Sequence, residues 1–215
     1  AHPQVEVKTV FSHLASADRP DQDDATRRQS EAFNRAAAAL RTVTPTIKTH
    51  LLNSSGLMRF PEAAGDYVRV GIALLGVVPT DEMDLKPVVQ FETAIASLHR
   101  IPPNEGVGYG LEDAATHERI LATLPVGYAD GYPRSLSNGK GHVVVRGRRV
   151  AVVGKVCMDM TMVDVTSVPG VRIGDSVELF GRQLPIVEVA AAAGTIAYEI
   201  LSRIPMRVLR EQRGG

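Results

Sequence analysis

Residues 68–74 read Val-Arg-Val-Gly-Ile-Ala-Leu, a nearly continuous apolar run with one arginine near its start. Strands that are covered on both faces show such runs, and parallel sheets are normally covered on both faces. Two further strand-like stretches precede this run, at residues 5–11 and 47–51, with an alanine-rich helical stretch at residues 24–40 between them. The first part of the chain therefore predicts strands that alternate with helices around a parallel sheet.

The pattern changes after Pro79. A long strand is expected at residues 88–99, followed by a Pro-Pro-Asn-Glu-Gly turn. Shorter strands with glycine-rich turns between them are expected at 121–126, 142–145, 149–154, 162–165 and 176–180, and helices at 187–193 and 195–203. This spacing is typical of an antiparallel β domain. We expect two domains, residues 1–80 of α/β type and residues 81–215 mainly β.

Composition excludes several classes of protein. The 215 residues carry 24 basic and 24 acidic side chains, so neither a nucleic-acid groove nor a polybasic membrane patch is expected. The longest apolar run, residues 70–78, is broken by glycines and is far shorter than the roughly 18 residues of a membrane span. The single cysteine, Cys157, excludes an intrachain disulfide and fits a reducing, cytoplasmic compartment.

Metal and dinucleotide sites have little support. The six histidines show no HxH or HExxH pairing, and with one cysteine the sequence predicts no metal site. Cys157 is either a nucleophile or, as lone thiols more often are, a small buried apolar side chain. The glycines at 106, 108 and 110 resemble a dinucleotide loop only superficially, because no parallel strand precedes them and no helix follows.

Polar residues fall at the ends of the predicted parallel strands. His13, Ser54 and the pair Gly71-Ile72 lie where open α/β sheets and barrels bind their ligands. The segment Asn53-Ser-Ser-Gly offers hydroxyls and N–H groups to an anion, or is an ordinary helix N-cap. Arg69 within an apolar strand is costly unless it is paired or lies at a rim.

Two tyrosines stand between glycines. Residues 105–110 read Glu-Gly-Val-Gly-Tyr-Gly, a loop with almost no side chains around Tyr109. Tyr128 follows Gly127 in Leu-Pro-Val-Gly-Tyr-Ala-Asp-Gly-Tyr. Each tyrosine either packs into a tight turn or is left accessible because the neighbouring glycines have no side chains.

Together these segments resemble alanine racemase, a fold-type III enzyme that depends on pyridoxal 5′-phosphate (PLP). The matching stretches follow the family's order and cover nearly the whole chain. They are Phe11-Ser-His-Leu-Ala-Ser-Ala-Asp, His50-Leu-Leu-Asn-Ser-Ser-Gly, Val68-Arg-Val-Gly-Ile-Ala-Leu-Leu-Gly, Gly106-Val-Gly-Tyr-Gly, Leu124-Pro-Val-Gly-Tyr-Ala-Asp-Gly-Tyr-Pro-Arg, Val153-Gly-Lys-Val-Cys-Met-Asp-Met-Thr-Met-Val-Asp and Gly194-Thr-Ile-Ala-Tyr-Glu-Ile-Leu. After Tyr109 this chain has Gly-Leu-Glu-Asp, whereas many members continue Gly-Ala-Thr and a further aromatic.

The resemblance implies an N-terminal (β/α)8 barrel, a C-terminal β domain, and a homodimer with shared active sites. The family's Lys-Ala-Asn-Ala-Tyr-Gly motif, whose lysine carries PLP, is not in this sequence, and Lys8 and Lys48 lie in other motifs. Three parallel strands cannot close an eight-stranded barrel. We therefore expect the last three βα units of the barrel followed by the β domain. On this hypothesis the chain is a C-terminal portion, inactive until the missing N-terminal segment is supplied.

The resemblance also implies a role for each site residue in the interconversion of L- and D-alanine, which supplies a peptidoglycan precursor. Tyr109 acts as one of two bases, because racemisation needs a proton removed on one face of Cα and returned on the other. His13 orients Arg69, which faces the PLP pyridine nitrogen. The phosphate is held by Ser54, Gly71, Ile72 and Tyr198, and the substrate carboxylate is met by Tyr128 and the backbone of Met158.

Three alternatives stay open at this stage. Alanine and serine are not distinguished as substrates. Without the lysine, the chain is alternatively a non-catalytic PLP-binding, dimerisation or interaction module derived from a racemase. A β-barrel binding module unrelated to PLP is the third possibility, although neutral charge and few aromatic residues argue against it.

Overall fold

The computed structural model describes residues 4–77 and 85–213, and the chain divides into two compact units, Ala1–Lys86 and Pro87–Gly215. Each unit has its own hydrophobic core. Within the described ranges, no helix combines the length and hydropathy that crossing a membrane requires.

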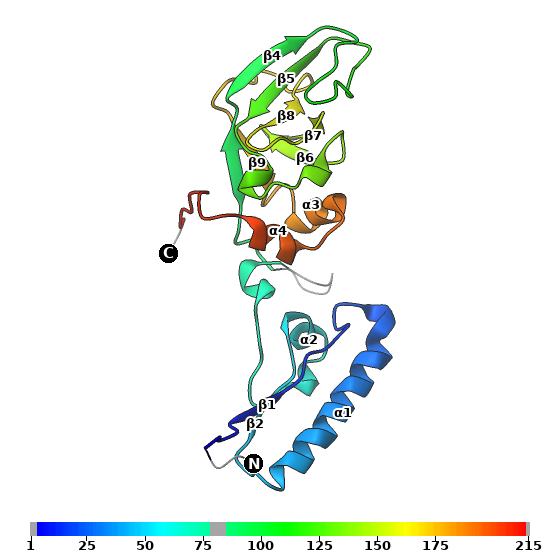
Figure 1. Cartoon of the computed structure of the whole chain (residues 1–215), viewed down its shortest axis with the longest axis vertical. Helices are drawn as coiled ribbons and strands as arrows, with labels where there is room; N and C mark the ends of the chain where they lie inside the picture. The colour runs from blue at the N-terminus through cyan, green and yellow to red at the C-terminus, as the bar shows by residue number, and fades with distance from the viewer. Residues whose placement is uncertain (1–3, 78–84, 214–215) are drawn as a thin grey trace. The chain divides into compact units, whose positions relative to one another are not determined.

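The first unit is built around two short parallel strands. Strand β1 (Thr9–Phe11) pairs with β2 (Lys48–His50), with Phe11 opposite His50. The connection between them contains the 3-10 helix η1 (Pro20–Gln22) and helix α1 (Asp23–Arg41), which runs alongside the strands in Figure 1. The expected βαβ connection is therefore present, although both strands are shorter than the sequence predicts.

A small core holds this unit together. Helix α1 directs Phe33 into it, and the other buried members are Leu14, Ala17, Leu51, Leu52 and Phe60. After β2 the chain forms α2 (Ser54–Arg59) and two further 3-10 helices, η2 (Pro61–Ala63) and η3 (Ile72–Leu75). These elements place the ends of β1 and β2 and the start of α2 close together.

The prediction of a strand at residues 68–74 is wrong, because this segment is extended only up to Gly71 and forms a 3-10 helix after it. This segment runs beside β2, because the Tyr67 N–H donates to the Thr49 carbonyl at 3.1 Å and the Arg69 N–H to that of Leu52 at 2.9 Å. These two bonds form no regular ladder, and the chain turns at Gly71 into η3. A short apolar run is expected in a buried strand and also in a buried helical turn, so its composition does not distinguish the two.

The second unit contains, among the described residues, a seven-stranded antiparallel sheet in the order β3-β9-β6-β7-β8-β5-β4. Its strands are β3 (Phe91–Ala94), β4 (Ser97–Ile101), β5 (Arg119–Leu124), β6 (His142–Val145), β7 (Arg148–Val153), β8 (Thr161–Asp164) and β9 (Ser176–Phe180). The 3-10 helices η4 (Tyr128–Asp130) and η5 (Arg134–Leu136) and the helices α3 (Ile186–Ala193) and α4 (Ala197–Arg203) complete the unit. The predicted antiparallel β domain is confirmed.

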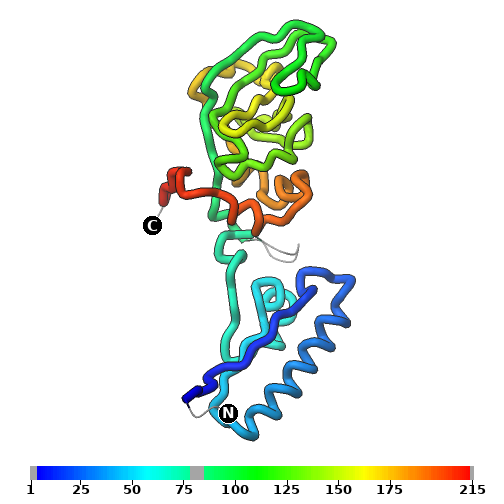
Figure 2. Tube along the Cα trace, in the orientation of Figure 1, coloured from blue at the N-terminus to red at the C-terminus, as the bar shows by residue number. Residues whose placement is uncertain are grey.

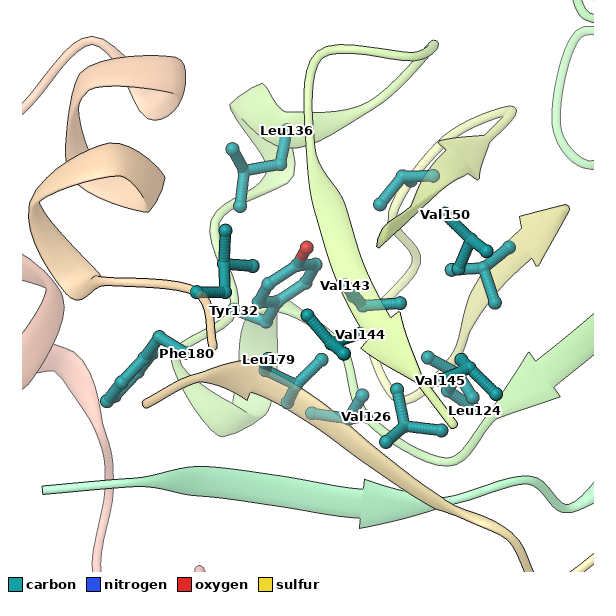
Figure 3. Close-up of a cluster of buried hydrophobic side chains, with 14 of the residues drawn as sticks. Leu124, Val126, Tyr132, Leu136, Val143, Val144, Val145, Val150, Leu179 and Phe180 are labelled. Atoms are coloured by element: carbon teal, nitrogen blue, oxygen red, sulfur yellow. The ribbon is translucent and has the colours of Figure 1, made fainter. Parts of the chain in front are cut away.

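The long strand expected at residues 88–99 is two strands. Figure 2 shows the chain passing directly from β3 into β4, although these strands form opposite edges of the sheet order. The break falls at Ile95, which is fully buried, and whose N–H donates to Asp175 while its carbonyl accepts from Gly174. Because only two residues join the two edges, the sheet curls around its valine-rich core (Figure 3).

Tyr132 lies in that core with 1% of its surface exposed, among the side chains of Figure 3. Its hydroxyl has no hydrogen-bond partner within the described structure. Burial raises the pKa of the Tyr132 phenol far above its ordinary value, because the apolar core disfavours the phenolate. The hydroxyl therefore makes folding less favourable than a hydrogen in its place would.

We predict that Tyr132→Phe raises the free energy of unfolding by about 1 kcal/mol at neutral pH, since an unsatisfied buried hydroxyl is removed. Above about pH 10 the unfolded phenol releases its proton while the folded one keeps it, so wild-type stability falls with rising pH. The variant lacks this contribution, and the stability gap between the two proteins should widen from pH 10 upward. Urea unfolding at several pH values measures both effects.

The exposed Tyr67→Phe is the control for this prediction. Parallel pH profiles of stability for wild type and Tyr132→Phe would contradict it.

Candidate functional site

Arg69 forms hydrogen bonds with residues at the carboxyl ends of both parallel strands. Its Nη1 donates to the Nδ1 and the carbonyl of His50, both at 3.0 Å. Its Nη2 donates to the carbonyls of Ser12 at 2.9 Å and Leu51 at 3.1 Å, and contacts Nδ1 of His13 at 3.2 Å. The arginine is therefore paired, and its partners are backbone and imidazole acceptors at the carboxyl ends of β1 and β2.

A guanidinium only donates, so Nδ1 of His50 must accept, which places the proton of this neutral ring on Nε2. His13 has a donor beside each ring nitrogen, Nη2 of Arg69 at 3.2 Å from Nδ1 and Nδ2 of Asn53 at 3.5 Å from Nε2. The Arg69 contact is shorter and its donor is charged, so it favours Nδ1 as the acceptor of His13. The His50 ring stacks on Phe11 at 5.1 Å, and the Arg69 guanidinium lies 5.5 Å from the same phenyl ring. The Nε–H of Arg69 is the donor that remains, because it has no acceptor among the described residues.

The start of α2 supplies a second group of donors beside Arg69. Asn53 caps the helix, since its Oδ1 accepts from the Gly56 N–H at 2.8 Å. Ser54, 4% exposed, instead accepts the Gly71 N–H at 3.0 Å, which joins the start of α2 to the start of η3. A Cβ at Gly71 would meet nothing within 4 Å, so the space in front of this backbone is open. The cap belongs to Asn53, and the Ser54 hydroxyl lies beside that open space.

Tyr109 lies on the surface of the second unit with 72% of its surface exposed, so it is not a packed turn residue. The loop that carries it begins at the buried Val107, which packs with Leu121 and Val153. A side chain at Gly106 would clash with the Leu111 backbone, so the two ends of the loop approach closely only because residue 106 is glycine. The loop presents the phenol outward.

Tyr128 and Met158 are brought together in the same unit. The Tyr128 N–H donates to the Cys157 carbonyl, and the next N–H in the chain to that of Met158, both at 3.0 Å. A side chain at Gly127 would clash with both of these carbonyls. Tyr128 is 43% and Met158 55% exposed, and the Met158 N–H has no acceptor among the described residues.

Arg207 links the turns that carry these two residues. Its Nε donates to Asp130 and its Nη2 to Asp159, each at 2.8 Å. Asp130 in turn accepts the Gly127 N–H at 2.9 Å. The hydrogen bonds that the guanidinium donates to Asp159 and to Asp130 raise the pKa of Arg207 above its ordinary value. The arginine therefore stays charged and holds the two turns together.

The predicted site residues fall into two groups, one in each unit. His13, Ser54, Arg69, Gly71 and Ile72 lie close together in the first unit. The second unit carries Tyr109, Tyr128, Met158 and also Tyr198, which is half-exposed in the first turn of α4. No group of three metal-ligating side chains occurs within residues 4–77 and 85–213. The half-buried Cys157 thiol donates to the Lys155 carbonyl at 3.3 Å.

Sequence reasoning missed His50 and Arg207. His50 begins one of the matched segments and ends β2, a signal that could have placed it beside His13. Arg207 carries no local signal, because its carboxylate partners lie 77 and 48 residues away in the chain.

Comparison with known proteins gives a consistent result. The family model for the alanine racemase N-terminal domain matches residues 1–79, and that for the C-terminal domain matches residues 88–212. The alanine racemase of Halothermothrix orenii is 40% identical over 218 residues, which cover 97% of this chain and 57% of that protein. The enzyme of Symbiobacterium thermophilum is 44% identical over 216 residues, which cover 96% of this chain and 56% of that protein.

Solved structures agree with these sequence matches. The biosynthetic alanine racemase of Pseudomonas aeruginosa superposes with a TM-score of 0.83 at 36% identity, covering 98% of this chain and 58% of that one. Alanine racemase of Bartonella henselae, solved with covalently bound pyridoxal phosphate, gives 0.87 at 36% identity over 94% and 56%. The chain thus spans little more than half the length of these relatives. The expected fold class, part of a (β/α)8 barrel followed by an antiparallel β domain, is confirmed.

We predict that Arg69→Lys lowers the free energy of unfolding by about 3 kcal/mol. A lysine cannot reach all five acceptors that the guanidinium bridges, and a hydrogen bond to a charged group contributes about 1.5–3 kcal/mol net. Urea unfolding followed by far-UV circular dichroism measures the change. Arg35→Lys, at an exposed position of α1, is the matched control and should shift stability by less than about 0.5 kcal/mol. Equal effects of the two substitutions would contradict this account of Arg69.

Proposed function

The chain belongs to the alanine racemase family, and we propose that it forms the part of a PLP-dependent alanine racemase that holds the cofactor and supplies one base. Because the relatives are considerably longer, the complete activity also requires residues outside the matched region. The first unit would be the end of the barrel, residues 1–80, and the second the β domain, residues 81–215. The observation that carries the proposal is the Arg69 cluster at the ends of β1 and β2.

The donor set of the first unit fits PLP. The pyridine nitrogen is a hydrogen-bond acceptor, and the Nε–H of Arg69 is a donor without an acceptor among the described residues. The guanidinium is already oriented by five contacts, so it would keep its position when the ring binds. Because arginine cannot take up or release a proton, it would hold the ring nitrogen in its unprotonated form.

The phosphate would lie at Ser54 and the backbone N–H groups of Gly71 and Ile72, with the hydroxyl of Tyr198 as a further donor. The open space in front of Gly71 supports this assignment, since no side chain of the described residues fills it. Asn53 caps α2, so the Ser54 hydroxyl is available to reorient from the Gly71 N–H toward an anion. These residues bind and orient the cofactor without taking part in proton transfer.

When bound, PLP supplies the electron sink for the electron pair left as the Cα–H bond of alanine breaks. Tyr109 would take and return the proton on one face of Cα through its Oη. A phenol ionises at about pH 10 in water, so this role requires a neighbouring donor. The Nε2–H of His13 is suited to that role, because the Arg69 contact favours Nδ1 of the same ring as the acceptor.

Tyr128 and Met158 would receive the substrate carboxylate. The phenol of Tyr128 and the N–H of Met158 are both donors, and their turns are held together by backbone hydrogen bonds and by Arg207. As in the homodimers typical of the family, the second unit of one protomer would offer Tyr109, Tyr128 and Met158 to the first unit of its partner. Alanine, the substrate named for the relatives, is the proposed substrate.

The test is Tyr109→Phe in the chain combined with the lysine-bearing N-terminal region of a relative. We predict that racemisation falls by about 100-fold or more, because general acid–base groups contribute about 10²- to 10⁴-fold. PLP binding should be unchanged. In D2O, one enantiomer of alanine should still exchange its Cα proton through the other base, while exchange from the second enantiomer stops. Proton NMR of each enantiomer measures this asymmetry.

The exposed Tyr67→Phe is the matched control and should racemise as wild type does. Equal loss of exchange from both enantiomers would contradict a one-face role for Tyr109. If a folded, PLP-loaded complex of the unsubstituted chain shows no racemisation at all, the non-catalytic module becomes the better proposal.

A further inference from the structure

Two carboxylates, Glu112 and Asp113, follow the Tyr109 loop directly. They come two and three residues after Gly110, in Tyr109-Gly-Leu-Glu-Asp. Within the loop, Gly108, Gly110 and Leu111 all have positive φ, at 68°, 85° and 49°. Only glycine adopts such angles without strain, so the Leu111 backbone needs surrounding contacts to hold it.

Asp113 is held from two elements of the sheet. Its Oδ1 accepts from Nη1 of Arg119 at 2.9 Å, and its backbone carbonyl accepts from Nη2 at 2.6 Å. Its Oδ2 accepts the Gly154 N–H at 3.2 Å. Arg119 begins β5, and Gly154 follows β7, so Asp113 connects the end of the loop to two strands.

Because the Arg119 guanidinium is buried, loss of its partner Asp113 would be strongly destabilising. The Arg119 side chain is 6% exposed and that of Asp113 is 29% exposed. A buried guanidinium without its carboxylate would leave an uncompensated charge, so the two side chains are strongly coupled. This pair joins a loop to the sheet. Arg119 bonds the backbone carbonyl of Asp113 as well as its carboxylate, so it fixes the loop's backbone and also neutralises the carboxylate.

Glu112 adds a weaker contact on the outside. Its Oε1 accepts from Nζ of Lys155 at 2.7 Å and its Oε2 from Nδ2 of Asn138 at 3.0 Å. The hydrogen bond from Lys155 holds the pKa of Glu112 below its ordinary value. The Glu112 side chain is 48% and that of Lys155 27% exposed, whereas Arg119 is only 6% exposed, so this contact limits the loop's motion less than the pair of Asp113 and Arg119 does.

We propose that Asp113 and Arg119 are positioning residues that hold the Tyr109 loop in a single conformation, and so place the phenol for proton transfer. The catalytic part of this statement rests on the proposed function of Tyr109. The loop is fixed at Val107 on one side and at Asp113 on the other, and the segment between them carries the phenol. Loss of the second fixed point should free the loop while the sheet stays folded.

The chain contains no tryptophan, so Tyr109→Trp introduces a single fluorescent reporter at the loop itself. In this background we expect Asp113→Asn to lower the anisotropy of the introduced indole and to raise its acrylamide quenching constant about two-fold, since a freed loop moves faster and is more accessible. Far-UV circular dichroism should be unchanged. The matched control is Glu118→Gln, which removes one negative charge from an exposed pair with Arg100. Asp113→Asn with unchanged anisotropy would overturn the proposal.

The double variant Asp113→Ala/Arg119→Met covers the case in which the single substitution unfolds the protein. It removes both charges of the pair, and such replacements of an ion pair commonly preserve stability. We expect a folded unit with a mobile indole at position 109, because the loop's link to the sheet is gone. A folded double variant whose reporter is as ordered as in the parent would overturn the proposal, since the pair would then be purely structural.

Fluorescence and turnover separate this inference from the proposed function. With Tyr109 in place and the N-terminal region supplied, Asp113→Asn should lower kcat about ten-fold with KM and PLP affinity nearly unchanged. Should Tyr109→Phe remain fully active, the proposed function fails, while the loop's dependence on Asp113 is still decided by the fluorescence of the reporter. A KM effect without any change in kcat would show that Asp113 acts on substrate binding and would overturn its positioning role.

Discussion

The first unit depends on one requirement: a charged guanidinium at the edge of a small core must find acceptors. Arg69 finds them in the carbonyls of Ser12, His50 and Leu51, which end the two parallel strands. The two short strands make few hydrogen bonds with each other, so the hydrogen bonds from Arg69 contribute much of the interaction that holds their ends in place. The same contacts make Nδ1 of His50 an acceptor, favour Nδ1 of His13 as one, and leave Nε–H directed at no described residue. One arginine thus joins the fold of this unit to its chemistry.

In the second unit, a comparable constraint comes from the backbone. Two residues connect opposite edges of the sheet at Ile95, so the sheet must curl, and the core fills with branched side chains. The turns that carry Tyr128 and Met158 pack backbone against backbone because Gly127 has no side chain. Main-chain hydrogen bonds position groups more rigidly than long side chains do, since few rotamers are lost on ordering. The rigid part of this candidate site is therefore its backbone.

Much of this could be predicted from sequence because it is local. The β strands at residues 142–145 and 176–180 follow from branched runs bounded by glycine-rich turns, and the helix at residues 24–40 follows from its composition. The failures are non-local. The break at Ile95 depends on pairing with residues near 175, and the turn at Gly71 is joined to Ser54 at the start of α2. The matched motifs supplied His13, Ser54 and Arg69, but only coordinates reveal that His50 completes their network.

The loop around Tyr109 shows why motif and mechanism are different levels of explanation. Its glycines explain how the backbone can turn so sharply and leave the phenol exposed, but the same glycines give the chain conformational freedom. A base must stay within hydrogen-bond reach of the proton it takes, and a misplacement of about 1 Å can cost 10²-fold in rate. A bare loop therefore needs order from outside itself. In this chain the ion pair between Asp113 and the buried Arg119 provides it. The specificity of the motif and the rigidity of the loop thus come from different residues.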